Sequence, residues 1–168
     1  MLNTILRYSL VFILLFAIQV LLMNNIQFSG FVNPYIYILF ILLLPFETPS
    51  WLLLIISFFT GLLVDITTGT PGLHTSATVF AGFLRPYVLK LVAPRDGYEP
   101  GDKPGINTNG FRWFFLYVLV IVLFHHLALF YIEVFSFDYF FRTMLRALLS
   151  AGFSILFIII IQLLVIRR

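Results

Sequence analysis

Histidines and carboxylates are the residues of this sequence whose types could hold a metal ion, and three of them lie close together. His125 and His126 are adjacent, and Glu133 follows two turns later on the helix that this region predicts. Adjacent residues on a helix point about 100° apart, so one helix cannot bring all three side chains to a single ion. The pattern therefore favours hydrogen-bonded contacts with neighbouring helices, and we expect no metal centre and no cofactor.

Small and polar residues also recur at helical spacing between residues 61 and 85. Gly61 and Asp65 share one helix face, where the glycine lets a neighbouring backbone approach closely. The next predicted helix carries a stripe of polar and small residues: His74, Thr78, Gly82 and Arg85. Such a stripe on an otherwise apolar helix should face protein. Arg85 lies roughly 9 Å from the expected inner end, within snorkelling reach of the interface, so a structural anchor and a functional role are both open.

The serines and acids of the chain do not fall into a known catalytic pattern. No serine stands in a nucleophile elbow, and there is no phosphate-binding loop, zincin motif or pair of intramembrane aspartates. The lack of cysteine excludes disulfides, thiolate metal sites and a cysteine nucleophile. Ala147 and Ala151, beside Ser150 and Ser154, form a small-xxx-small pattern that is typical of close helix packing. We therefore expect a protein that is not an enzyme.

The composition says what must surround these residues. Of the 168 residues, 61% are hydrophobic and 10% are charged, with a mean hydropathy of +1.07, which a water-soluble domain of this length could not bury. The solvent must be a lipid bilayer. The net charge of +3 comes from Lys and Arg spread along the chain, which indicates a topological signal and no nucleic-acid partner.

Turn residues divide the chain into six apolar segments. We predict an all-α integral membrane protein with six transmembrane helices in a single domain, residues 1–168. The predicted spans are 6–23, 32–44, 51–64, 73–92, 113–132 and 143–166, and 93–112 is a flexible cytoplasmic loop. The second span is too short for a full helical crossing, so it must begin earlier, tilt, or form a re-entrant hairpin.

The orientation follows from the basic residues. With the amino terminus inside, six spans place every Lys and Arg except Arg142 and Arg146 on the cytoplasmic side, as the positive-inside rule favours. Both termini are then cytoplasmic. Asp65 and Glu133 would lie near the outer interface, either paired with Arg142 or Arg146 or as ordinary interfacial charges in contact with water.

The region around Asp65 also resembles a known family. Gly61, Leu62 and Asp65, followed after a short turn by Gly72 and an apolar helix, are similar to the GLxxD...G signature of the rod shape-determining protein MreD family. The residues around Arg85, Pro86 and Tyr87 and the run from Pro94 to Tyr98 are similar to members from the Bacteroidetes branch. The resemblance implies a non-enzymatic scaffold of the bacterial inner membrane. Such proteins work with MreC, the MreB filament, the glycosyltransferase RodA and its partner transpeptidase, and regulate cell shape and peptidoglycan synthesis in the elongasome.

The scaffold hypothesis has a specific structural form. Small residues would face neighbouring helices or the single span of a partner: Gly61, Gly82, Ala147 and Ala151. The external turns that carry Asp65 and Gly72 would shape the periplasmic side. A lipid-modifying enzyme is a further hypothesis, but the sequence offers no set of catalytic residues for it.

The fold of this family suggests an alternative function. The MreD family resembles in fold the substrate-binding S components of energy-coupling-factor vitamin transporters. An S component would need a pocket near the outer face, lined by Tyr131, His74 and Asp65. Such subunits often carry an AxxxA pair in the first helix, whereas residues 6–23 hold only Ala17, which lowers the transporter hypothesis.

Overall fold

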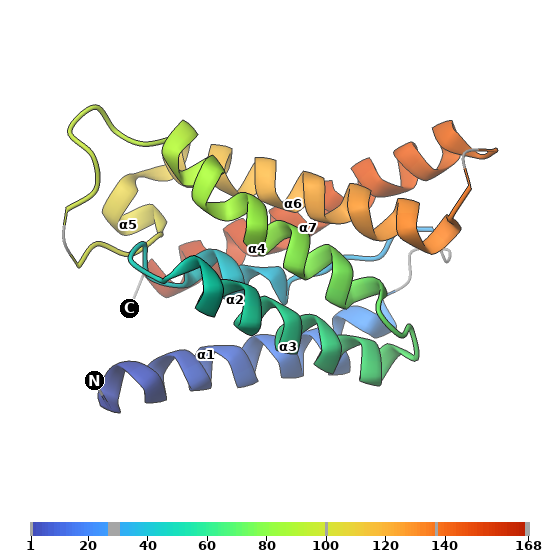
Figure 1. Ribbon diagram of the computed structural model, residues 1–168, viewed down its shortest axis with the longest axis horizontal. Coiled ribbons are helices and arrows are strands. Elements are labelled where there is room, and N and C mark those ends of the chain that lie inside the picture. Colours follow the sequence, from blue (N-terminus) through green and yellow to red (C-terminus); the bar gives the residue numbers. More distant parts are fainter. Residues whose placement is uncertain (1, 27–30, 100, 137, 167–168) are drawn as a thin grey trace.

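The computed structural model describes residues 2–26, 31–99, 101–136 and 138–166, and this part of the chain is all-helical. The long helices run roughly along the long axis of the molecule (Figure 1). Their bounds are α1 Leu2–Leu21, the short 3-10 helix η1 Met23–Asn25, α2 Ile38–Leu43, α3 Ser50–Thr68, α4 Leu73–Leu91, α5 Ile106–Asn109, α6 Phe111–Val134 and α7 Phe140–Ile166.

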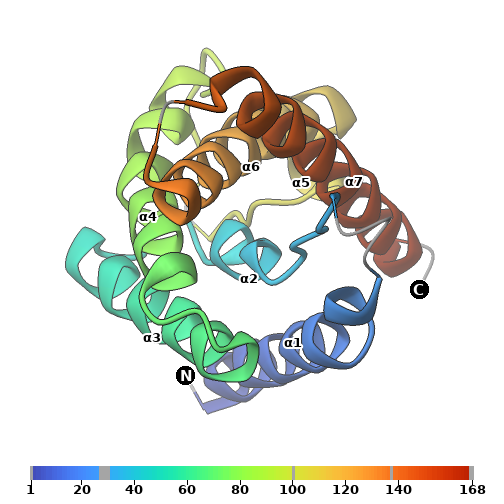
Figure 2. The ribbon, with the colours of Figure 1, turned by 90° about the vertical axis from the view of Figure 1, so that its right-hand side faces the viewer.

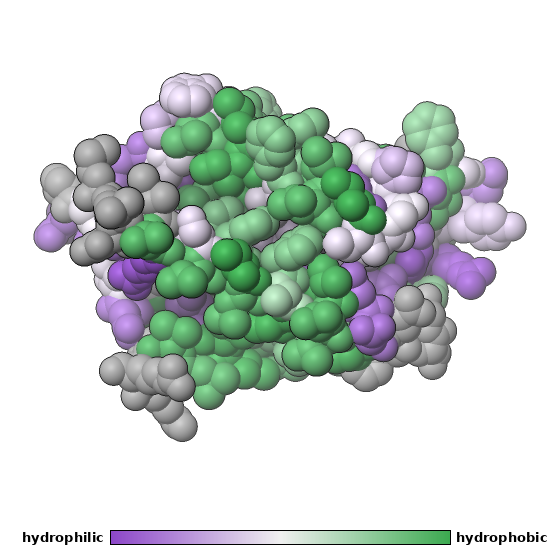
Figure 3. Space-filling view, turned by 90° about the horizontal axis from the view of Figure 1, so that it is seen from below, coloured by the Kyte–Doolittle hydropathy of each residue, from purple (hydrophilic) through white to green (hydrophobic). Residues whose placement is uncertain are grey.

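Four segments within the described residues are long and apolar enough to cross a membrane: Leu6–Asn25, Ser50–Thr68, Phe111–Val134 and Phe140–Val165. On the face seen in Figure 3, a broad hydrophobic zone covers the middle and polar residues gather toward its two ends. This is the surface of a membrane protein. α4 falls outside the group because its polar stripe, Arg85 and Lys90 lower its hydropathy, and α2 has only six residues.

The second predicted span differs most from its prediction. Residues 32–44 were expected to be helical, but α2 is confined to Ile38–Leu43 and the stretch before it is extended. Pro34 contributes to this difference, since it has no backbone N–H and disfavours a helical residue before it. An extended chain rises about 3.3 Å per residue against 1.5 Å in a helix, so an unwound segment covers a greater distance with few residues.

α2 lies at the centre of the bundle. Seen end-on, α1, α3, α4, α6 and α7 surround it (Figure 2). Its sequence, ILFILL, is apolar on every face, as a helix enclosed on all sides requires. Ile38, Leu39, Ile41 and Leu42 are completely buried. The chain therefore places its shortest helix where the longer helices can cover it.

The segment predicted as a flexible loop, 93–112, is partly anchored. The ring of Tyr98 stacks on Phe46 with centroids 4.1 Å apart, and its hydroxyl donates to the Leu89 carbonyl at 2.7 Å. The Gly101 N–H donates to a carboxylate oxygen of Glu47 at 2.9 Å, which lowers the pKa of Glu47 below its ordinary value. The loop and the α2–α3 turn thus pack together at the end of the bundle where α1 begins and α7 ends (Figure 1).

Candidate functional site

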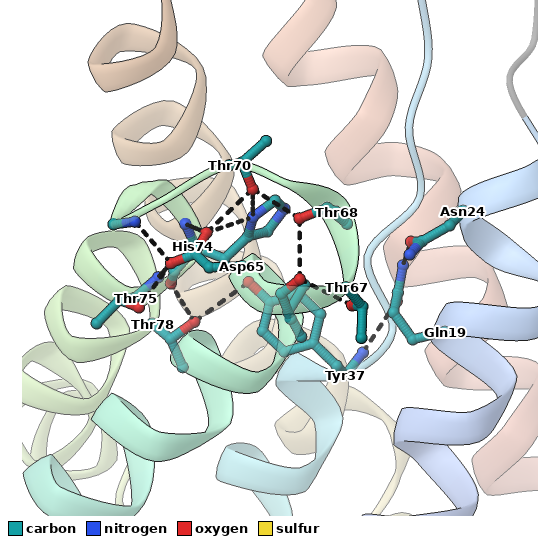
Figure 4. A network of polar contacts seen from close by, with 12 residues as sticks. Gln19, Asn24, Tyr37, Asp65, Thr67, Thr68, Thr70, His74, Thr75 and Thr78 are labelled. Atoms are coloured by element: carbon teal, nitrogen blue, oxygen red, sulfur yellow. Dashed lines mark hydrogen bonds and ion pairs between the residues drawn. The ribbon is translucent and has the colours of Figure 1, made fainter.

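The polar network centres on Asp65, in the last turn of α3 (Figure 4). The carboxylate is 3% exposed and accepts from the backbone N–H groups of Gly72, His74 and Thr75 at 2.9 to 3.0 Å. It also accepts from the hydroxyls of Thr70, at 3.1 Å, and Thr75, at 2.6 Å, and lies 3.0 Å from Nδ1 of His74. These N–H groups are the unpaired donors of the first turn of α4, so Asp65 caps α4 from a neighbouring helix.

Two glycines, Gly61 and Gly72, make this cap possible. A Cβ atom on Gly61 would lie 2.5 Å from the Cα of Thr75 and 2.7 Å from the carbonyl oxygen of His74, so only glycine lets the two helices touch here. Gly72 stands before α4 with a φ of 86°, a conformation that favours glycine. Leu62 is half-buried. Gly61, Asp65 and Gly72 therefore act together to join α3 to α4.

Gly82 is a second close contact between the same helices. Ser57 of α3 fills the space that a side chain on Gly82 would need, and its hydroxyl donates to the Leu53 carbonyl at 2.7 Å. Both glycines expected to meet neighbouring helices therefore do so within this chain. Ala147 and Ala151 are buried as well, at 0% and 2% exposed, so these four positions are not free to meet a partner's span.

Arg85 does not snorkel to the interface, although the sequence suggested that it could reach it. Its side chain is 1% exposed, and Nε donates to the Tyr117 hydroxyl at 2.8 Å. Nη2 donates to the carbonyl of Leu44 and, at 3.3 Å, to that of Pro45. Leu44 is the residue that ends α2, where a helix presents unpaired acceptors and partial negative charge, whereas the Pro45 carbonyl also accepts from Thr48. Arg85 thus caps the central helix.

Side chains of the outer helices accept hydrogen bonds from the backbone N–H groups of the extended segment before α2. The Oε1 atom of Gln19, on α1, accepts from the N–H of Ile36 at 2.7 Å. On α7, the hydroxyls of Ser150 and Ser154 accept from the N–H groups of Asn33, at 3.1 Å, and Tyr35, at 2.8 Å. Unwound backbone inside a membrane is tolerated only when protein groups pair it in this way.

The adjacent histidines of α6 have different partners, in line with the expected contacts between helices. His125 Nε2 lies 2.8 Å from the Tyr37 hydroxyl, and His126 Nε2 lies 2.9 Å from the Ser154 hydroxyl. Both histidines are completely buried. Among the described residues, no group of three or more His, Cys, Asp or Glu side chains could hold a metal ion.

The charged residues at this end of the bundle pair in part as anticipated. Arg146 Nη1 lies 3.1 Å from both carboxylate oxygens of Glu133, and its guanidinium carbon is 4.4 Å from the centre of the Phe130 ring. Asp65 makes its hydrogen bonds to α4 and the preceding turn, including one to the imidazole of His74 at 3.0 Å, and no arginine is among its partners in the described residues. The expected pairing is thus found for Glu133 alone.

A polar cavity of about 360 Å³ lies between this ion pair and the α3–α4 turn. It opens among the ends of α3 and α6, the starts of α4 and α7, and the extended segment. Its lining includes Asn33, Tyr35, Thr70, His74, Glu133 and Arg146. The pocket required for an S component was expected to include Tyr131 and Asp65, but neither is among the described residues that line it.

Gln19, Tyr37 and Asn33 also belong to this polar region, although the sequence did not predict them as site residues. A signal was present for Gln19, because an amide inside an apolar span has to find a hydrogen-bond partner. Tyr37 gave no such signal, since tyrosines are common at membrane interfaces.

Comparison of the chain with protein-family models, curated proteins and solved structures finds no match. The resemblance to the MreD family thus stays a prediction from the sequence.

Proposed function

We propose that this protein is a non-enzymatic scaffold of the bacterial inner membrane that belongs to the cell-wall elongation complex, as the sequence resemblance implies. The observation that carries the proposal is the role of the signature residues. Gly61, Asp65 and Gly72 join α3 to α4, and both oxygens of the Asp65 carboxylate are occupied by hydrogen bonds. The signature thus serves to build a rigid helix pair, which suits a scaffold.

We further propose that the chain crosses the membrane six times, with both termini in the cytoplasm. The extended segment and α2 together supply a crossing that a helix of the same length would not reach. α4 supplies another, because its polar stripe faces other helices and not lipid. The start of α1 and the end of α7 lie at the same end of the bundle, which agrees with an even number of crossings (Figure 1).

The partner's span is proposed to bind between α1 and α3. The small residues once expected to meet it are used inside the chain, whereas large apolar side chains of α1 are exposed: Leu6, Leu10, Ile13 and Leu14. A groove of about 680 Å³ separates these two helices, with Ile13 and Phe59 on its walls and the hydroxyl of the exposed Ser9 at its side. We assign this groove to the transmembrane segment of MreC.

Site-specific photo-crosslinking in native membranes tests this assignment. A photoreactive residue at Ile13 or Phe59 should crosslink to MreC, since both side chains line the groove. The same residue at Leu148, which is exposed on α7 outside the groove, is the matched control and should not. Equal crosslinking from all three positions would refute the assignment of the groove as the binding site. Crosslinking to no elongation-complex protein would refute the scaffold role.

The S-component alternative is supported by one observation, the polar cavity beside His74. Thermal unfolding of the purified protein with riboflavin, thiamine or biotin discriminates the two functions. Stabilisation by one of these vitamins would favour the transport subunit, and an unchanged unfolding midpoint with all three would exclude the S-component function.

A further inference from the structure

Two buried polar atoms at the cavity beside the α3–α4 turn have no hydrogen-bond partner in the described part of the chain. One is Nε2 of His74, whose side chain is 4% exposed, and the other is Nε of Arg146. Both residues line the cavity of about 360 Å³. Buried polar atoms are nearly always paired, so two unpaired atoms at one cavity point to a missing partner.

The hydrogen bonds around His74 define what its free atom can do. Nδ1 lies 3.0 Å from the Asp65 carboxylate, which only accepts, so Nδ1 carries the proton. In the neutral imidazole Nε2 is then a bare acceptor. The backbone N–H of His74 also donates to Asp65, so the ring is held from two sides. The cavity therefore presents a fixed acceptor that calls for a donor on the ligand.

Arg146 supplies the complementary group. The guanidinium is always charged and Nε–H can only donate. One amino group of the guanidinium already pairs with Glu133, whose carboxylate also lines the cavity. The residues that line the cavity thus include one positive and one negative side chain, and His74 and Arg146 each hold a buried polar atom without a partner in the described part of the chain.

We propose that this cavity binds a small zwitterion, with its ammonium group donating to Nε2 of His74 and its acidic group accepting from Nε of Arg146. Hydrogen bonds to charged groups are about twice as strong as neutral ones, which favours a zwitterion over a polyol. Arg146 attracts the acidic group of the ligand, and the Asp65 carboxylate behind the His74 ring favours the ammonium group at the other side. This site is independent of the scaffold role, since a scaffold and a transport subunit could each carry it.

Two sources offer this chemistry: a free amino acid and the headgroup of phosphatidylethanolamine. The cavity volume lies near the lower end of the range of ligand pockets and suits either one. The two are separated by testing glycine and L-serine in detergent solution, and by placing the protein in phosphatidylethanolamine or phosphatidylcholine nanodiscs.

The probes include a matched chemical control. Glycine betaine has the charges of glycine but no N–H, so it cannot donate to His74. Isothermal titration of the purified full chain should detect binding of glycine or L-serine. The protein should bind betaine at least about tenfold more weakly. If the source is the lipid, the free amino acids will not bind, and unfolding will occur at higher temperature in phosphatidylethanolamine than in phosphatidylcholine, whose headgroup has no N–H.

Two variants connect binding to the proposed atoms. His74→Asn places an amide N–H near the position of Nδ1, so it can still donate to Asp65, but it lacks Nε2. Arg146→Lys keeps a positive charge for Glu133 and removes the Nε donor. Each variant should weaken binding about tenfold or abolish the difference between the two lipids. Arg142→Lys, outside this cavity, is the control and should behave as the wild type.

Several outcomes would overturn the proposal. They are equal binding of glycine and betaine without a difference between the lipids, no response to any probe, or variants that bind as the wild type does. If His74→Asn fails to fold, Arg146→Lys decides the question by itself.

Discussion

The hydroxyl of Tyr37 lies 2.8 Å from Nε2 of His125, in the completely buried centre of the bundle. It also lies 3.2 Å from the Thr78 hydroxyl, which donates to the His74 carbonyl at 2.6 Å. Because the Thr78 proton is used there, Tyr37 donates to Thr78 and His125 Nε2–H donates to Tyr37. One directed chain of hydrogen bonds therefore runs from α6 through the residue just before α2 to the start of α4.

Removal of the Tyr37 hydroxyl should destabilise the protein. Tyr37→Phe leaves a buried donor on His125 without a partner, at a cost of about 1–3 kcal/mol. We expect a lower unfolding midpoint in detergent, measured by intrinsic fluorescence or calorimetry. Tyr87→Phe, at an exposed site, is the matched control and should leave the midpoint unchanged. Equal midpoints for the two variants would contradict the chain of hydrogen bonds.

A single methyl group at Gly61 should separate α3 from α4. In Gly61→Ala the new Cβ would meet the backbone of Thr75 and His74, which cannot move aside as a side chain can. Overpacking of this kind costs about 1–3 kcal/mol or more. Gly152→Ala is the matched control because no atom lies within 4 Å of the added Cβ. Thermal unfolding should be lowered by the first substitution and unchanged or raised by the second.

Replacement of the Asp65 carboxylate by an amide should weaken the α3–α4 turn. In Asp65→Asn one acceptor oxygen becomes an NH₂ group that faces backbone donors, which leaves N–H groups of α4 unpaired at a cost of about 1–3 kcal/mol. Amide hydrogen exchange should rise in the first turn of α4. Asp96→Asn, at an exposed loop position, serves as the control. Unchanged exchange in α4 would show that Asp65 is not its cap.

Arg85 should not tolerate lysine. A lysine ammonium lacks the planar fork that contacts Tyr117 and the carbonyls of Leu44 and Pro45 at the same time. Arg85→Lys should therefore lower stability by about 1–3 kcal/mol. Lys90→Arg, on the same helix but exposed, should leave stability unchanged. Protease sensitivity in the α2–α3 turn provides the measurement, and equal sensitivity of both variants would refute the capping role.

The sequence predicts the helices better than their partners. The long apolar runs indicate α1, α3, α6 and α7, and the spacing of Gly61 and Asp65 correctly predicts a close helix contact. These features depend on residues a few positions apart.

The unwound segment could not be predicted in the same way. Residues 35–44 are almost entirely apolar, and an apolar run of that length is compatible with a buried helix or with an extended chain. The choice is made by Gln19, Ser150 and Ser154, and the two serines lie more than a hundred positions away in the sequence. The buried position of Arg85 has the same cause, since the end of α2 had to be located first.

The extended segment also determines how the outer helices respond to one another. α1 and α7 have few direct contacts, yet Gln19 on one and Ser150 and Ser154 on the other hold the same short stretch of backbone. The same short stretch of backbone therefore joins α1 to α7. Loss of the hydrogen bonds on one side would remove part of the connection between the two helices.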